Sequence, residues 1–282
     1  MECTVKFTPI SFSQRLKSML KVDFRRMFRS KLFYIMIACA LLVPIVMTVM
    51  LTMMDGTETV NQQTGEVTVM EGPESVWESI GTVSTDEEAS SDHASSDPAA
   101  AMGGMDVMAM CNINMAFMGV AVFVCLFISD DFRSGYAKNL FTVRAKKGDY
   151  VVSKTFAGFV CGGLMLIAYF VGALLGGAIT SLSFELGTLT VANIVQCMLA
   201  KILLMLVFVP IFTLISVAAK QKAWLSICGS LGGGMLLFMM VSMITPLNST
   251  LINVALCLAG GGMFAFGLGA FSRLVLQKTS LV

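Results

Sequence analysis

The hydrophobic positions of this chain fall into six long apolar runs that are separated by polar segments. Each run has the roughly 20 residues that an α-helix needs to cross the hydrocarbon core of a bilayer. The pattern therefore predicts an all-α polytopic membrane protein with six transmembrane helices. The predicted spans are residues 32–54, 107–129, 155–180, 191–219, 225–246 and 251–272.

A different pattern precedes the first run. Between residues 13 and 31, apolar side chains recur at helical spacing with basic side chains between them, which predicts an amphipathic helix in the membrane interface. Such a helix can be a simple anchor or can transmit motion to the spans, and the pattern leaves both open. Its basic residues are Arg15, Lys17, Lys21, Arg25, Arg26 and Arg29. We divide the chain into a cytoplasmic segment, 1–31, and a transmembrane domain, 32–282.

The basic residues predict the orientation of the spans. No lysine or arginine occurs between Lys31 and Arg133, and all 19 basic residues except Lys201 lie in four clusters beside apolar runs. Basic residues close to membrane spans stay in the cytoplasm. Both chain termini and the segment 130–154 are therefore predicted to be cytoplasmic, and the acidic segment 55–106 is predicted to be the large outer loop.

Composition agrees with a membrane protein and excludes several other classes. Hydrophobic residues make up 56% of the chain, charged residues 13%, and the mean hydropathy is +0.81. Soluble domains carry about 25% charged residues. Because the basic clusters are explained by orientation, we expect no nucleic-acid partner. The eight cysteines lack C-x-x-C spacing and His93 is the only histidine, so we expect no metal site.

Small residues recur at the four-residue spacing that lets membrane helices approach closely. Gly158 and Gly162 form one G-x-x-x-G pair, and Gly172 and Gly176 form another. The pairs are candidate helix-packing positions. They can serve packing within the chain, a subunit interface or a movable pathway wall.

Lys201 is the one basic residue inside an apolar run. We expect its side chain to extend to the outer headgroups, near Glu185. The alternative is a polar contact inside a translocation cavity.

The cytoplasmic segment that joins the second and third spans carries the strongest functional pattern. It begins with two acidic residues, continues through a glycine, a short apolar stretch and a basic patch, and ends with a lysine where the next apolar run begins. A segment of this length can form a short helix that lies along the membrane and faces a cytoplasmic partner. Its candidate residues are Asp130, Asp131, Gly135, Lys138, Arg144, Lys146, Lys147, Tyr150 and Lys154.

This segment resembles the corresponding part of the membrane subunits of type-2 ABC exporters (ABC-2 type permeases). The basic amphipathic helix, the six spans and the large outer loop after the first span extend the resemblance over the whole chain. In that family an acidic residue, a glycine, a lysine, a basic patch and a final lysine occur in this order. Here they correspond to Asp130 or Asp131, Gly135, Lys138, Arg144 and Lys154.

The resemblance implies a permease subunit in a bacterial plasma membrane, whose segment 130–154 couples to a separate ATP-binding subunit. This chain has no Gly-Lys dipeptide, which a phosphate-binding loop requires, so ATP and Mg²⁺ would be bound by the partner and no cofactor by this chain. A second permease subunit, either the same chain or a sister chain, would complete the pathway. The implied substrates are drugs, antimicrobial peptides or lipid-like molecules.

Three other functions compete with this interpretation. A secondary transporter would need ionisable groups within the spans, and only Lys201 qualifies. A membrane enzyme would need a catalytic constellation near a surface, which the single histidine in the outer loop does not supply. A membrane anchor or sensor subunit without transport activity remains compatible with the sequence.

Overall fold

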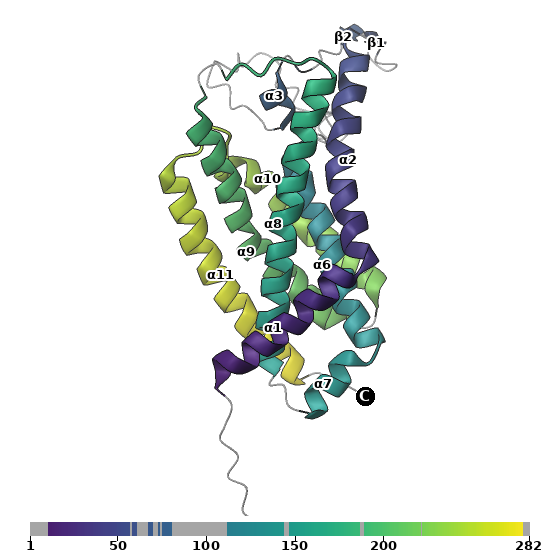
Figure 1. The fold of residues 1–282 in the computed structure, drawn as a ribbon, viewed down its shortest axis with the longest axis vertical. Helices are drawn as coiled ribbons and strands as arrows, with labels where there is room; N and C mark the ends of the chain where they lie inside the picture. Colours follow the sequence, from purple (N-terminus) through teal and green to yellow (C-terminus); the bar gives the residue numbers. More distant parts are fainter. Residues whose placement is uncertain are drawn as a thin grey trace, which may run out of the picture.

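The computed structural model describes residues 11–56, 58–60, 67–69, 73, 75–80, 112–143, 147–186, 189–220 and 222–278. Within these residues the chain forms a bundle of long helices, and the first helix of the chain crosses one end of the bundle (Figure 1). The helices are α1 Phe12–Arg29, α2 Lys31–Met54, α3 Val76–Ile80, η1 Ile113–Met115, α6 Ala116–Arg133, α7 Tyr136–Val143, α8 Lys147–Ile179, α9 Val191–Ala219, α10 Ala223–Ile244 and α11 Leu251–Lys278. Two short strands, β1 Glu58–Val60 and β2 Val67–Val69, pair in antiparallel fashion.

The long helices confirm the predicted all-α membrane fold. Five helical segments in the described chain are long and apolar enough to cross a membrane: α2, η1 with α6, α8, α9 and α11. The remaining predicted span, the fifth at residues 225–246, corresponds to α10, which has 22 residues but a shorter apolar stretch, Ala223–Leu237, among its described residues. Basic α1 and the short helix α7 of the segment 130–154 lie at the same end of the bundle (Figure 1).

One predicted boundary is wrong by two helical turns. The apolar pattern placed the start of the third span at residue 155, whereas α8 begins at Lys147. Tyr150, Ser153 and Lys154 therefore lie on a helix and not in a loop. All three side chains are buried, which explains why the helix continues past its apolar part: these polar groups find their partners inside the protein.

Close contacts between helices occur at the predicted small residues. Gly172 and Gly176 of α8 face α2: a Cβ on Gly172 would overlap the carbonyl oxygen of Leu41, and one on Gly176 would come within 3.1 Å of Thr48. Gly158 and Gly162 face α6 and α9, where a Cβ would come within 2.7 Å of Val209 and 3.1 Å of Met205, respectively. In this structure both pairs serve packing within the chain.

The predicted environment of Lys201 is wrong. Its side chain does not extend to the outer surface but is 3% exposed inside the bundle. The ammonium donates hydrogen bonds to Asn114 Oδ1 at 2.7 Å and to Thr245 Oγ1 at 3.1 Å. Through these two neutral partners Lys201 connects α9 with η1 and with Thr245, the C-cap residue of α10.

We predict that Gly172→Ala destabilises the protein by about 1–3 kcal/mol, because the new methyl group has to separate α2 from α8. Gly163→Ala is the matched control on the same helix, since its Cβ would lie 3.6 Å from Ile202 Cγ2, an ordinary contact. Thermal unfolding in detergent should show a lower midpoint for Gly172→Ala only. Equal midpoints for the two variants would contradict this packing.

Candidate functional site

The segment between the second and third spans folds into the end of α6, the short helix α7 and the beginning of α8. The turn between α6 and α7 depends on Gly135, whose φ of +74° is a conformation that glycine adopts without strain. Ser134 closes the end of α6, because its backbone N–H and its hydroxyl both donate to the carbonyl oxygen of Asp130, at 2.8 and 2.7 Å. The predicted short helix in this segment is therefore present as α7.

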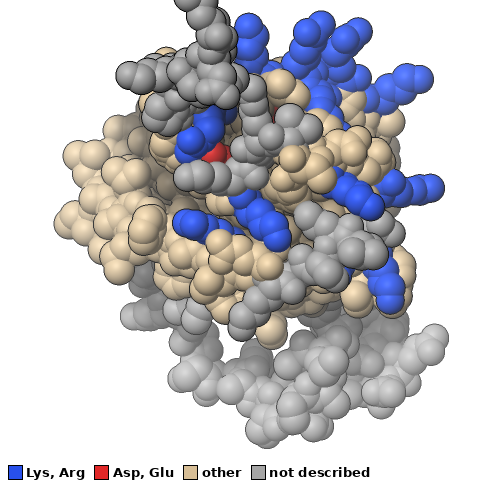
Figure 2. Space-filling model, turned by 90° about the horizontal axis from the view of Figure 1, so that it is seen from below, with Lys and Arg blue, Asp and Glu red and all other residues tan. Residues whose placement is uncertain are grey.

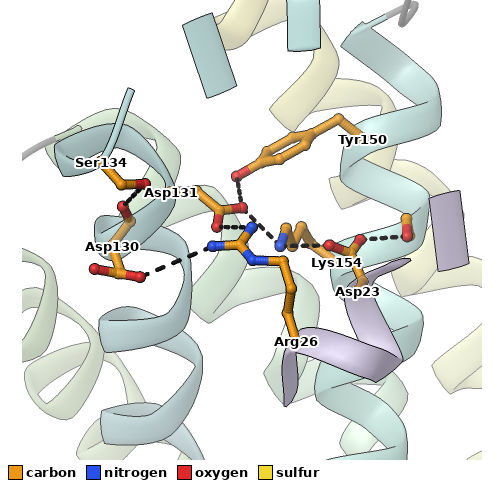
Figure 3. Close-up of polar contacts among 8 residues, drawn as sticks. Asp23, Arg26, Asp130, Asp131, Ser134, Tyr150 and Lys154 are labelled. Atoms are coloured by element: carbon orange, nitrogen blue, oxygen red, sulfur yellow. Dashed lines mark hydrogen bonds and ion pairs between the residues drawn. The ribbon is translucent and has the colours of Figure 1, made fainter. Parts of the chain in front are cut away.

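Four charged residues from α1, α6 and α8 meet beside this turn, and we refer to Asp23, Arg26, Asp131 and Lys154 as the charge cluster (Figure 3). The Lys154 ammonium lies 2.8 Å from Asp23 Oδ1 and 2.6 Å from Asp131 Oδ2. Arg26 Nη1 lies 2.6 Å from Asp131 Oδ1. The side chains of Asp23, Asp131 and Lys154 are fully buried.

Two hydroxyl groups complete the coordination of the carboxylates. Tyr150 donates to Asp131 Oδ2 at 3.0 Å, and Ser153 donates to Asp23 Oδ2 at 2.5 Å. Two acids and two bases make the cluster electrically balanced. This balance matters because an unpaired buried charge is strongly destabilising, whereas a paired and hydrogen-bonded one is tolerated.

Aromatic rings surround the cations of the cluster. Lys154 Nζ lies 4.0 Å from the centre of the Phe127 ring, and the Arg26 guanidinium lies 4.1 Å from the centre of the Tyr136 ring. Burial lowers the pKa of Arg26, but the charge and hydrogen bond of Asp131 outweigh it, so that the pKa is raised overall. Burial and the carboxylate of Asp23 raise the pKa of Tyr136. At neutral pH Arg26 is therefore charged and Tyr136 is neutral.

Helix α7 is attached to the charge cluster through its aromatic residues. Tyr136 is the first residue of α7, and its ring lies against the guanidinium of Arg26. The Phe141 ring packs edge-on against Tyr150 with 5.3 Å between ring centres. Ala137 is buried, whereas Lys138, Asn139 and Thr142 are exposed on the other side of the helix. Thus α7 has one face against the bundle and one polar face that is free for another molecule.

The first turn of α8 is also tied to both ends of the described chain. Arg15 Nε of α1 lies 3.0 Å from Asp149 Oδ2, and Lys147 Nζ donates to the backbone carbonyl of Leu276 in α11 at 2.8 Å. Figure 2 views this end of the molecule and shows lysine and arginine side chains gathered over it, with little acidic surface visible. The end is thus both strongly basic and held together by contacts between helices.

The structure brings together only some of the candidate residues. Asp131, Tyr150 and Lys154 meet in the cluster, and exposed Asp130 lies 3.8 Å from Arg26. Gly135 and Lys138 lie outside it, on the turn and on the exposed face of α7. On α1, Arg15 and Arg26 form ion pairs, while the exposed basic residues are Lys17, Lys21, Arg25 and Arg29. Arg144 and Lys146 lie outside the described residues.

Sequence reasoning missed Asp23, the second buried carboxylate. A signal was present: Asp23 is the only acid among the basic residues of the amphipathic segment, and it lies four residues from both Met19 and Met27. That spacing places it on the apolar face of the helix, where both methionines are buried. An acid on the buried face of a basic helix indicates a buried cation opposite, here Lys154.

Comparison with known proteins identifies the class of membrane protein. The family model described as ABC-2 family transporter protein matches residues 89–236, more than half of the chain, and the match includes α6, α7, α8 and α9. The chain therefore belongs to the ABC-2 family of transporter proteins. The comparisons found no match to a curated protein or to a solved structure.

Family membership gives the coarse function. The protein is a multi-pass membrane permease of an ABC transporter, and this family works as the transport subunit beside an ABC ATP-binding subunit.

We predict that Lys154→Met lowers the free energy of unfolding by about 3–5 kcal/mol, because two carboxylates remain buried with one cation. Adding Asp23→Asn to Lys154→Met should restore part of the loss, since Arg26 and Asp131 then form a balanced pair. The exposed Lys17→Met on α1 should change stability by less than about 0.5 kcal/mol. Denaturant unfolding in detergent measures all three, and a double variant no more stable than Lys154→Met alone would contradict the charge balance.

Proposed function

We propose that this protein is the permease of an ATP-driven exporter, and that α7 is the element through which a separate ATP-binding subunit acts on the spans. The observation that carries the proposal is the position of α7. Helix α7 presents an exposed polar face at the basic end of the bundle. Its other face contacts Tyr150, which donates a hydrogen bond to Asp131 of the charge cluster.

The connections around α7 support a mechanical role. A displacement of α7 acts on Tyr150 and Arg26, and these residues contact Asp131 and Lys154 directly. The cluster joins α1, α6 and α8, so a push on one short helix reaches two spans and the interfacial helix together. Rigid-body movement of packed helices is a common way to change access to a pathway.

The further parts of the proposal are suggested by the resemblance to the family. ATP and Mg²⁺ would be bound by the ATP-binding subunit, which would supply the energy. A second permease subunit, a copy of this chain or a sister chain, would complete the pathway, and the assembly would lie in a bacterial plasma membrane. The substrates we propose are drugs, antimicrobial peptides or lipid-like molecules.

The proposal is tested on the tagged chain purified in mild detergent from its native membrane. We expect an ATP-binding subunit to purify with it in stoichiometric amount and to hydrolyse ATP. Lys138→Glu should weaken this association about tenfold, because it reverses a charge on the free face of α7. Gly135→Val should lower ATP hydrolysis and cellular resistance to the exported compound, because valine is strained at positive φ and re-aims α7.

Lys222→Glu is the matched control. Lys222 is an exposed basic residue at the same end of the bundle, but it directly precedes α10 and does not belong to α7. It should leave both the association and ATP hydrolysis unchanged. If Lys138→Glu and Gly135→Val behave like this control, or if the chain purifies without any ATP-binding subunit even after cross-linking, the assignment of α7 is wrong.

A further inference from the structure

Two adjoining clefts lie between α1 and α6 at the basic end of the bundle. The first, about 500 Å³, is lined by Arg25, Arg26, Arg29, Ser30, Phe127 and Asp130. The second, about 420 Å³, shares Ser30, Phe127 and Asp130 with the first and continues towards Leu32, Leu126 and Arg133. The pair therefore forms one continuous surface that changes from a mostly basic part to a part where apolar side chains, Leu32, Leu126 and Phe127, lie among polar ones.

The basic part of this surface carries positive charges that are not neutralised by ion pairs within the described residues. Arg26 is engaged with Asp131, and its distance to Asp130 is 3.8 Å. Arg25 and Arg29 are exposed, and within the described part of the chain no carboxylate forms an ion pair with either. They lie four residues apart on α1, so both guanidinium groups are on the same side of the helix. Such a pair suits a phosphate group.

The apolar part has the character of a lipid contact. Phe127 is buried at the floor shared by both clefts, and Leu32 and Leu126 are half-buried beside it. This is the point where the interfacial helix α1 ends and the span α2 begins. The neighbouring side chains of Phe28, Tyr34 and Ile35 are exposed, as expected for residues that face lipid.

We propose that these clefts bind one anionic phospholipid of the cytoplasmic leaflet. Its phosphate pairs with Arg25 and Arg29, and the beginning of its acyl chains lies along Phe127, Leu126 and Leu32. The site goes beyond the proposed transport function, because it needs neither ATP nor an ATP-binding subunit. A bound lipid here would fill the space between α1 and α6 and so support the helix that supplies Asp23 and Arg26 to the charge cluster.

Asp130 lines both clefts, and its exposed carboxylate opposes an anion. Asp130 therefore allows a test of whether its removal strengthens or weakens lipid binding. If the site binds an anionic headgroup, Asp130→Asn should tighten binding by about fivefold, whereas loss of a structural contact would weaken it.

The experiment is native mass spectrometry of the protein alone, extracted from vesicles that contain phosphatidylglycerol and phosphatidylcholine in equal amounts. The wild-type chain should retain one phosphatidylglycerol. The double variant Arg25→Gln/Arg29→Gln should bind it roughly thirtyfold more weakly at low salt. The control is Lys17→Gln/Lys21→Gln, which removes two exposed charges from the same helix outside both clefts and should retain the lipid.

Three results would overturn the proposal. Equal loss of lipid from both double variants would mean diffuse attraction to the basic helix and no defined site. If inorganic phosphate in lipid-free detergent stabilises the protein against heat as much as phosphatidylglycerol does, the clefts are a site for a free anion. Unchanged lipid retention in Arg25→Gln/Arg29→Gln, together with loss of a copurifying acidic protein, would mean that a protein partner occupies the clefts.

Discussion

The burial of Lys154 between Asp23 and Asp131 is the interaction on which the basic end of this protein depends. An ammonium 2.8 Å from one carboxylate and 2.6 Å from another, with all three side chains fully buried, is tolerated only while every partner is in place. The partners come from α1, α6 and α8, so these helices can dock only in the register that completes the cluster. Buried polar groups often fix such a register while adding little net stability.

This constraint changes how the amphipathic helix is understood. The sequence pattern allows α1 to be a simple anchor on the membrane surface. In the structure, however, α1 supplies Asp23 and Arg26 to the cluster and Arg15 to Asp149 at the start of α8. Helix α1 is thus joined to the bundle by its charges as well as by the buried Met19 and Met27. A movement of α7 that reaches Tyr150 would be carried to α1 as well as to the spans.

The fold could largely be predicted from sequence, because span length and charge asymmetry are direct consequences of bilayer physics. The apolar runs correspond to α2, α6, α8, α9, α10 and α11, and the short helix α7 was also anticipated. Errors occurred where tertiary contacts outweigh local pattern. Helix α8 extends to Lys147 because its polar first turns are buried against α1, and Lys201 is held by Asn114 and Thr245, which are distant in sequence. No hydropathy pattern contains those pairings.

The candidate site was predictable as a segment but not as a geometry. The alternation of acidic, glycine and basic residues indicated a coupling element, yet it did not separate Asp131, which is buried in the cluster, from Asp130, which is exposed. Nor did it show that Lys154 belongs to the buried cluster while Lys138 is free on α7. The separation depends on which face of α6 and α7 packs against α1 and α8, and that is decided by contacts between distant parts of the chain.

The most direct test of the account is a photo-cross-linking amino acid placed at Asn139, on the exposed face of α7, in the protein in its native membrane. A coupling role for α7 predicts cross-links to an ATP-binding subunit whose yield changes when ATP is bound, and no such cross-links from the same group placed at Leu256 on the exposed apolar surface of α11. Cross-links from Asn139 only to lipid or to unrelated proteins, in cells where the exporter is active, would contradict it.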